Sequence, residues 1–411
     1  MQAINIFLIT SHFPPKRGGV ETTNLRYLDF FERQKNIQVT VLTYENRYGA
    51  KFHDYWKKSK VIRIRVPAPL LEFMIGLKSV SRLNSPFKMF LYFFLHTGYL
   101  IAESIIHLRE LLRADKILVN GALVESFTGY VLSALTKKKY CVSWCTDLSG
   151  NLANIAIKLC LKRAFVIRVN GEDIKEKLVN LTGIDETKVF VTKYSVDTQI
   201  FYPVPQIKAR TILNLPSERF IILFAAAFNQ FKFCDLIVNS IPSLFQKKES
   251  DFFFIFIGEG PLDCAIEGLQ KSYKSNILFM NHFVSHETLN LYINASDIII
   301  GSADIYYASK VVFESLACGT PVLIFNTSGH VEKRRGKLKF KIPLPHVFLV
   351  HPSQDELCTF LINNKSKINQ MRNNTQLIEM SRRFISQNHG PEKLTNEIMH
   401  LINLNNPLRV D

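Results

Sequence analysis

A lysine and a glutamate stand four residues apart in the segment Ser309–Leu323, which is predicted to form a helix ended by Gly319 and then a buried strand. Residues four apart share one face of a helix. Lys310 and Glu314 could therefore form an ordinary surface ion pair. Alternatively, the amine lies near a diphosphate at the helix start and the carboxylate lies near a ribose diol. The two residues alone leave both interpretations open.

Two glycine turns follow predicted strands. Gly258 and Gly260 come directly after the apolar run Phe252–Ile257, and Gly18 and Gly19 lie between the first apolar run and a helix-like segment. Glycine lets the backbone approach a ligand closely, and a helix start offers unpaired N–H groups to an anion. Both turns are equally compatible with plain strand-to-helix connections. Neither has the spaced Gly-x-Gly-x-x-Gly pattern of a dinucleotide site.

Runs rich in Ile, Val and Phe alternate with longer amphipathic segments in two series, which predicts parallel sheets covered by helices on both faces. The predicted strands of the first series are Ile4–Ile9, Val39–Thr43, Val61–Val66, Lys116–Val119, Tyr140–Ser143, Phe165–Val169 and Val189–Thr192. Those of the second are Phe220–Phe224, Phe252–Ile257, Ile277–Phe279, Asp297–Ile300, Pro321–Phe325 and Val347–Val350. A polar stretch with Pro203 and Pro205 separates the series. We therefore expect an α/β protein of two doubly wound domains facing a central cleft.

Composition sets the broad class of protein. The chain has 411 residues, 47% of them hydrophobic, which is enough for two or three domains with sizeable cores and excludes a peptide or a disordered linker. The opening residues lack the features of a signal peptide, which predicts a cytoplasmic protein. Seven cysteines with no Cys-x-x-Cys pair and no His at zinc spacing predict free thiols and no structural metal.

The net charge of +16 is concentrated in the first half, where residues 1–200 hold 29 Lys/Arg and 17 Asp/Glu. Nine of these basic residues lie within 51–88, among aromatic side chains, and the apolar segment Phe87–Ile106 follows. That segment contains Lys88 and Glu103, which disfavours a membrane span and leaves a packed helix or a membrane-surface helix. Residues 51–106 therefore suit an anionic membrane surface, with ordinary solvated charge as the alternative. No nucleic-acid-binding module accompanies the charge, so nucleic acid is not an expected partner.

Several motifs occur in the order found in one large enzyme group. The segment Glu314–Val322 reads Glu-Ser-Leu-Ala-Cys-Gly-Thr-Pro-Val, Gly258–Pro261 reads Gly-Glu-Gly-Pro, and Gly18–Glu21 reads Gly-Gly-Val-Glu. With Ser195–Thr198 and Ala295–Asp297, these motifs resemble those of the retaining, nucleotide-sugar-dependent glycosyltransferases of group 1, which have the GT-B fold. The resemblance covers nearly the whole chain.

The resemblance implies a hexosyl-type transferase that moves a sugar from a nucleoside diphosphate sugar to a hydroxyl of a glycan or lipid-linked saccharide, as in polysaccharide or lipopolysaccharide synthesis. It implies an acceptor-side domain over 1–204, a donor domain over 205–385 and a C-terminal helix within 386–411 that packs back on the first domain. It also implies that no metal or other cofactor is needed. Together with the basic segment, it predicts a peripheral enzyme on the inner face of the cell membrane.

The same resemblance assigns the site residues. Glu314 is expected on the donor ribose, Lys232 stabilises the leaving diphosphate as a catalytic residue, and Asp147 lies near the acceptor hydroxyl, although a turn residue is an alternative for Asp147. The remaining expected donor contacts are Gly18, Gly19, Gly258, Gly260, Val284, Ser309 and Lys310.

Three positions depart from the family pattern. Ala227 stands where the family has an arginine, Phe233 where it has a glycine, and Tyr306 where it has its first glutamate. Lys310 is a candidate replacement for the missing cation. Ala227 and Tyr306 keep open the alternative of an inactive protein that still binds nucleotide sugars. A second alternative is a non-hydrolysing sugar-nucleotide epimerase of the same architecture, which the signature around Glu314 disfavours.

Overall fold

The structure is a computed structural model that describes residues 4–11, 13, 19–34, 36–44, 53–64, 86–121, 123–144, 151–169, 171–192, 194–246, 251–303, 308–326 and 342–402. Contacts divide the chain into two compact units. The first unit comprises Met1–Thr192 and Thr395–Asp411, and the second unit comprises Lys193–Leu394. The stretch with Pro203 and Pro205 lies inside the second unit.

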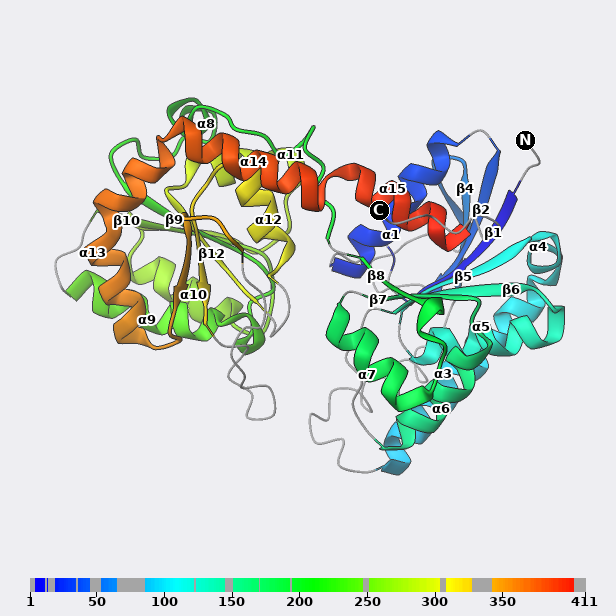
Figure 1. The fold of residues 1–411 in the computed structure, drawn as a ribbon. Helices are drawn as coiled ribbons and strands as arrows, with labels where there is room; N and C mark the ends of the chain where they lie inside the picture. Colours follow the sequence, from blue (N-terminus) through cyan, green and yellow to red (C-terminus); the bar gives the residue numbers. More distant parts are fainter. Residues whose placement is uncertain are drawn as a thin grey trace. The chain divides into compact units, whose positions relative to one another are not determined.

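The described part of the first unit contains an eight-stranded sheet in the order β3-β4-β2-β1-β5-β6-β7-β8. Its strands are β1 (Ile4–Ile9), β2 (Ile37–Tyr44), β3 (His53–Trp56), β4 (Ser59–Ile64), β5 (Lys116–Gly121), β6 (Lys139–Trp144), β7 (Val166–Val169) and β8 (Val189–Val191). Its helices are α1 (Gly19–Arg33), α3 (Pro86–Ile106), α4 (Leu108–Arg113), α5 (Leu123–Thr136), α6 (Asn151–Arg163), α7 (Glu172–Thr182) and the short 3-10 helix η1 (Glu186–Lys188). Figure 1 shows α1 on one face of the sheet and α3, α5, α6 and α7 on the other.

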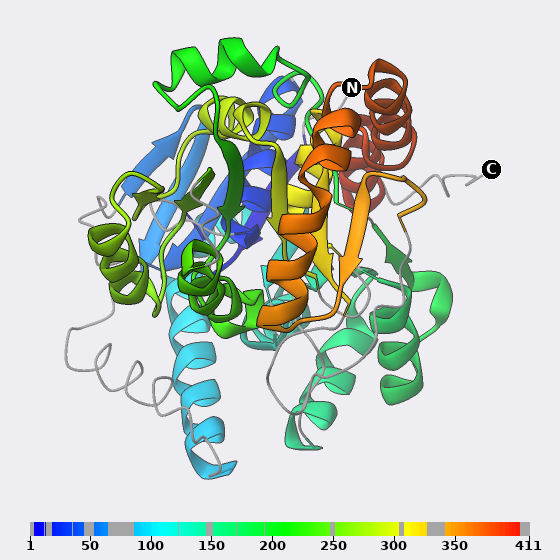
Figure 2. The same cartoon turned by 90° about the vertical axis from the view of Figure 1, so that its left-hand side faces the viewer.

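The described part of the second unit contains a six-stranded sheet in the order β11-β10-β9-β12-β13-β14. Its strands are β9 (Phe220–Ala225), β10 (Phe252–Ile257), β11 (Ile277–Met280), β12 (Ile298–Gly301), β13 (Val322–Phe325) and β14 (Val347–Val350). Its helices are α8 (Gln206–Ile212), η2 (Gln230–Lys232), α9 (Cys234–Gln246), α10 (Asp263–Ser272), α11 (His286–Ala295), α12 (Lys310–Ala317), α13 (Gln354–Arg372) and α14 (Thr375–His389). The last helix of the chain, α15 (Pro391–Ile402), begins in this unit and continues into the first. Figure 2 shows the second unit from the side on which α13 lies.

Each predicted strand is present, and the named strands in the described part of the chain all pair in parallel, except β3 with β4. Strand β3 is not among the predicted strands, because it is short, polar and at the edge of the sheet. It pairs antiparallel with β4 through a turn in which Lys57 has a φ of 55°. The prediction of two doubly wound domains is confirmed.

Alternation along the central strand β9 explains the two cores of the second unit. Phe220, Ile222 and Phe224 belong to the hydrophobic cluster that includes residues of α9 and α13. Ile221 and Leu223 belong to the cluster that includes residues of α11 and α12. Successive side chains of a strand point to opposite faces, so a continuous apolar run supplies both cores at once.

Helix α15 is fixed to the first unit by a buried ion pair. Arg168 Nε of β7 lies 2.6 Å from Glu397 Oε1 of α15, and both side chains are buried. Tyr27 of α1 donates a 2.5 Å hydrogen bond to the same carboxylate. Burial and the neighbouring carboxylate both raise the pKa of Tyr27, so its hydroxyl stays protonated and can donate.

Helix α3 is packed in part, as expected for the apolar segment. Phe93 contacts Phe127 of α5 edge to face, with ring centroids 5.3 Å apart, whereas Phe94 is 64% exposed. Among the described residues, no helix combines the length and apolar content needed to span a membrane.

Candidate functional site

The order of strands in the second unit locates the most favourable place for a ligand. The chain leaves β9 toward β10 on one side, and later returns to place β12 on the other side. In doubly wound sheets, ligands bind beyond the carboxyl ends of the strands at this reversal. Three segments begin there: Ala226–Lys232 after β9, Gly258–Gly260 after β10, and the segment after β12 that leads to Ser309. Predicted site residues lie in or just after all three.

The glycine turn after β10 packs against the loop after β9. Gly258 has a φ of 150°, and a Cβ at this position would lie far inside van der Waals contact with the carbonyl oxygen of Ala226. A Cβ on Gly260 would lie 2.5 Å from the carbonyl oxygen of Phe228. The amide of Phe228 also donates to the carbonyl of Glu259 at 3.1 Å. Both glycines are therefore needed to bring the two loops together.

The amides of these glycines already have acceptors. Gly258 N donates to the carbonyl of Met280 at 3.1 Å, and Gly260 N donates to Asp263 Oδ1 at 2.8 Å. The geometry thus gives the pair a loop-shaping role. An anion would have to find its donors elsewhere at this edge of the sheet.

Helix α12 begins at the same edge and offers such donors. Ser309 is its N-cap residue with a φ of −64° and a ψ of 158°, but its side chain makes no capping hydrogen bond. Ser309 Oγ is buried and has no hydrogen-bond partner within the described residues. The first turn contains no acidic side chain and includes Lys310. The helix dipole and the lysine both favour a negative charge at this point.

Glu314 lies one turn further along α12, and Lys310 and Glu314 share one face of the helix. Glu314 is 5% exposed, so its carboxylate is almost fully removed from solvent. Lys310 is half-buried, and its Nζ lies 5.5 Å from the ring centroid of Tyr194. A carboxylate removed from solvent and an amine therefore lie within one turn of each other at the start of α12.

Lys232 ends the short helix η2 after β9 and is half-buried. Its amide donates to Asn229 Oδ1 at 3.1 Å, which caps η2. The next residue, Phe233, has a φ of 59°, the left-handed conformation that usually favours glycine. Its ring is fully buried, with its centroid 4.9 Å from that of Phe325 in β13. The departure from the family's glycine therefore keeps the glycine conformation, because burial of the ring offsets the backbone strain.

The other predicted site residues lie in different parts of the chain, and some of them lie outside the described residues. Val284 is half-buried in the loop after β11, where it packs against the hydrophobic cluster that includes residues of α11 and α12. Gly19 begins α1 in the first unit. Gly18, Asp147 and Tyr306 lie outside the described residues. In the parts of the chain that the structure describes, no cluster of three or more His, Cys, Asp or Glu side chains is arranged to hold a metal ion.

A buried chain of polar side chains that was not predicted from the sequence lies at the corresponding strand ends of the first unit. Asn120 Nδ2 donates to Asn24 Oδ1 at 2.6 Å, and Asn24 Nδ2 donates to Thr10 Oγ1 at 3.0 Å. These residues come from β5, α1 and the end of β1, at the point where the strand order of this sheet reverses. A motif search could not find them, since isolated Asn and Thr residues carry no distinctive spacing.

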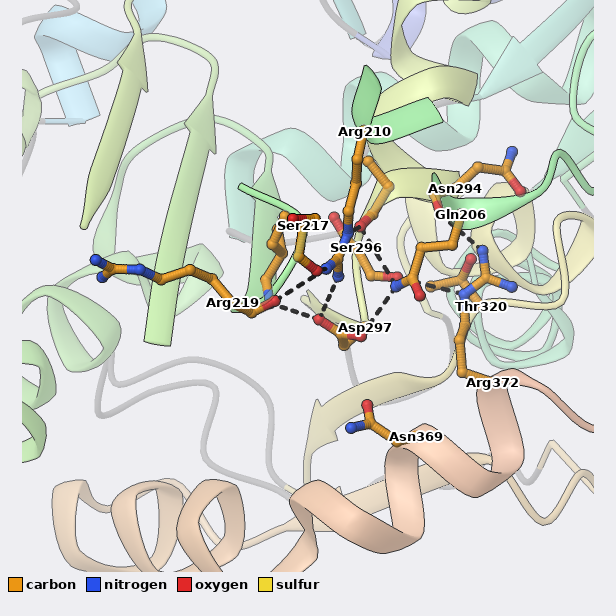
Figure 3. Close-up of polar contacts among 12 residues, drawn as sticks. Gln206, Arg210, Ser217, Arg219, Asn294, Ser296, Asp297, Thr320, Asn369 and Arg372 are labelled. Atoms are coloured by element: carbon orange, nitrogen blue, oxygen red, sulfur yellow. Dashed lines mark hydrogen bonds and ion pairs between the residues drawn. The ribbon is translucent and has the colours of Figure 1, made fainter. Parts of the chain in front are cut away.

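A second missed cluster lies at the opposite edge of the second unit's sheet (Figure 3). Asp297 Oδ2, just before β12, lies 2.8 Å from Arg210 Nη2 and accepts from the amide of Ile221 at 2.6 Å. Arg372 Nη2 donates to the carbonyl of Asn294 at 2.8 Å. Because the cluster joins the amino ends of β9 and β12, it supports the sheet and does not contribute to the site at the carboxyl ends.

Known proteins share both the sequence pattern and the fold. Residues 205–334 match the family model described as glycosyl transferases group 1. The chain is 24% identical over 169 residues to D-inositol 3-phosphate glycosyltransferase from Mycobacterium tuberculosis, a match covering 39% of this chain and 34% of that relative. The chain thus matches about a third of the length of this curated relative.

Solved structures are similar over nearly the whole chain. Sucrose-phosphate synthase from Thermosynechococcus elongatus superposes with a TM-score of 0.69 at 17% identity, covering 97% of this chain and 98% of that chain. Anabaena Alr3699/HepE in complex with UDP-glucose gives a TM-score of 0.67 at 14% identity, covering 97% and 99%. The resemblance inferred from the motifs is therefore confirmed: residues 205–334 match the group 1 glycosyltransferases, and the chain as a whole has the GT-B fold.

Proposed function

We propose that this protein is a retaining, hexosyl-type glycosyltransferase that uses a nucleoside diphosphate sugar as donor and a hydroxyl of a glycan or lipid-linked saccharide as acceptor. The observation that carries the proposal is the start of α12, where Ser309, Lys310 and buried Glu314 follow the carboxyl end of β12 at the strand reversal. Its place within the family match at 205–334 supports the same role.

The donor's diphosphate lies at the start of α12 in this proposal. Lys310 and Lys232 supply positive charge, and Ser309 Oγ supplies a hydroxyl donor. Glu314 accepts hydrogen bonds from the ribose hydroxyls. Ala227 supplies no cation at the family's arginine position, so Lys310 takes that role.

In the reaction, the bond between the anomeric carbon and the diphosphate oxygen breaks while the acceptor oxygen bonds to the same face of the sugar. The nucleoside diphosphate leaves with the bonding electron pair, and the acceptor hydroxyl passes its proton to an oxygen of this departing diphosphate. Negative charge therefore grows on the leaving oxygen, which is where fixed positive groups lower the barrier most. We place Asp147 near the acceptor hydroxyl, and Gly18 and Gly19 near the donor. No metal or other cofactor is required in this scheme.

A thermal-shift screen of nucleoside diphosphates and their sugars tests the donor site, because a ligand that binds only the folded state raises its apparent stability. Glu314→Gln keeps the shape of the side chain and removes its charge. Since hydrogen bonds to a charged group contribute about 1.5–3 kcal/mol, we expect the variant to bind the responding ligand about 10-fold more weakly or worse while remaining folded. Equal affinity in both proteins would refute the assignment of Glu314.

An inactive nucleotide-sugar-binding protein is the second candidate, and Ala227 at the family's arginine position is the observation that favours it. The two candidates differ only in turnover. A donor that stabilises the protein but yields no glycoside with any acceptor would favour the second candidate.

We also propose that the enzyme binds the inner face of an anionic membrane through the first unit. Four side chains at the end of α3 and along α4 are between 43% and 70% exposed: Ile105, Ile106, Leu108 and Leu112. Arg109 and Arg113 of α4 are exposed among them. Apolar side chains flanked by arginines suit the headgroup region of anionic lipids.

Two lysines of the basic segment 51–88 form ion pairs within the first unit, so they are weaker candidates for binding anionic lipids. Lys57 pairs with Asp29 at 2.5 Å, and Lys60 pairs with Glu110 at 2.6 Å. We therefore expect sedimentation with phosphatidylglycerol vesicles at low salt to be reduced by Ile106→Ser with Leu112→Ser. Leu159→Ser is the control, because Leu159 is 52% exposed on α6. Binding that is absent, or that Ile106→Ser with Leu112→Ser reduces no more than Leu159→Ser does, contradicts this membrane face.

A further inference from the structure

The chain enters and leaves the second unit through two segments that are hydrogen-bonded to each other. Val196 N donates to the carbonyl of His389 at 2.7 Å, and Ser195 Oγ donates to the carbonyl of Gly390 at 3.2 Å. His389 Nδ1 lies 2.6 Å from the carbonyl oxygen of Tyr194 and must be the donor, since a carbonyl only accepts. The backbone of Tyr194 is thereby fixed from the end of α14.

Tyr194 and His389, which are hydrogen-bonded to each other, both contact α12. The ring of Phe313 stacks on His389, with centroids 4.0 Å apart and an interplanar angle of 27°. One turn earlier on the helix, Lys310 Nζ lies 5.5 Å from the ring centroid of Tyr194, within the range of a cation–π interaction. The contacts form a closed circuit that starts and ends on α12: Lys310, Tyr194, His389, Phe313.

We propose that Tyr194 is a positioning residue for Lys310, and that His389 holds Tyr194 in place for this purpose; the inference rests on the proposed function. A lysine amine on a four-carbon stem has many rotamers, and fixing one of them before a ligand arrives lowers the cost of binding. The ring face of Tyr194 attracts the ammonium, and the circuit through His389 and Phe313 ties that ring to the same helix. Lys310 is thus held beside Ser309 ready for the diphosphate.

The position of Tyr194 in the sequence gives this arrangement its significance. Tyr194 lies outside the family match at 205–334, and no site motif includes it. The entering segment therefore contacts Lys310, which lies more than a hundred residues later in the chain.

A double-mutant cycle tests the proposal. Dissociation constants for UDP and for uridine are measured by calorimetry on the full chain, or with the matching pair of another base if UDP does not bind. An exposed cation–π contact corresponds to about a two- to fivefold effect, so Tyr194→Leu should weaken UDP binding by about that factor and leave uridine unchanged. Tyr194→Phe keeps the aromatic face and should bind UDP like the wild type. In a Lys310→Met background, Tyr194→Leu should have no further effect.

The controls separate positioning from a general loss of structure. Tyr202→Leu changes a 46% exposed tyrosine of the same unit and should alter neither affinity. The inference is overturned if Tyr194→Leu weakens the binding of uridine as much as that of UDP. It is also overturned if Tyr194→Leu weakens UDP binding by the same factor in the Lys310→Met background. If Lys310→Met binds UDP as tightly as the wild type, Lys310 does not contact the diphosphate, and the inference is refuted. Transfer activity in that variant would leave the proposed function standing.

Discussion

Replacing Asp297 by alanine should destabilise the second unit strongly. The Asp297 side chain is 8% exposed and accepts hydrogen bonds from three directions. Its Oδ2 lies 2.8 Å from Arg210 Nη2 and 2.6 Å from the amide of Ile221, and its Oδ1 accepts from Gln206 Nε2 at 2.9 Å. The substitution removes all three contacts and leaves Arg210 buried without this carboxylate.

The magnitude follows from the charges that remain. Burial lowers the pKa of Arg372, Asp297 acts to raise it, and Arg210 acts to lower it further. Without Asp297, no carboxylate at this position offsets the repulsion between the buried guanidinium groups of Arg210 and Arg372. Removing one partner of a buried ion pair typically costs about 3–5 kcal/mol, and we expect a loss in this range.

Urea unfolding followed by far-UV circular dichroism measures the loss. Both tryptophans, Trp56 and Trp144, belong to the first unit, so fluorescence reports that unit as an internal reference. Asp251→Ala is the matched control, because Asp251 pairs with Lys365 at 2.7 Å but is 51% exposed. The control should cost at most about 1 kcal/mol. If Asp297→Ala costs no more than its control, the buried pair does not stabilise the unit as argued.

Three further predictions concern single positions. Gly258→Ala should destabilise the second unit by about 1–3 kcal/mol and weaken UDP binding, because the added methyl group displaces the carbonyl of Ala226; unchanged thermal unfolding and calorimetry would contradict this. Burial lowers the pKa of His346 to about 4, so the folded state keeps this ring neutral while the unfolded chain takes up a proton below its ordinary pKa of about 6.5. As pH falls from about 6.5 to 4, the wild type should therefore lose about 3 kcal/mol that His346→Gln does not lose, measured by urea unfolding at each pH. Among the six cysteines in described positions, exposed Cys264 should react first with iodoacetamide, whereas buried Cys141 and Cys160, whose pKa values burial raises to about 12, should react only after unfolding. Peptide mass spectrometry showing early modification at Cys141 would argue against its burial.

The strands could be predicted because parallel strands buried on both faces are nearly continuous apolar runs. Phe252–Ile257 is the clearest case, and its bounds agree with β10. The polar edge strand His53–Trp56 carries no such pattern, and its pairing with β4 depends on a turn at Lys57. An edge strand pairs with only one neighbouring strand, so the sheet constrains its amino-acid composition less than that of a central strand.

The start of α12 could be located from sequence because Lys310, Glu314 and Gly319 are close along the chain. The buried cluster around Asp297 could not, because Arg210 lies 87 residues away. For the same reason, spacing alone gives no indication that Tyr194 contacts Lys310. At Phe233 the residue type is misleading. Phenylalanine rarely adopts a positive φ, but burial of its ring against Phe325 stabilises the left-handed conformation at this position.

The most direct measurement for the central claim is the anomeric configuration of a transferred sugar. The protein is incubated with a nucleoside diphosphate sugar that raises its melting temperature and with hydroxyl-bearing glycan or lipid-linked acceptors, and the product is analysed by NMR. We predict a glycoside with the same anomeric configuration as the donor, formed more slowly by Glu314→Gln and Lys310→Met. A product of inverted configuration, or an epimerised donor with no glycoside, would contradict the proposed reaction.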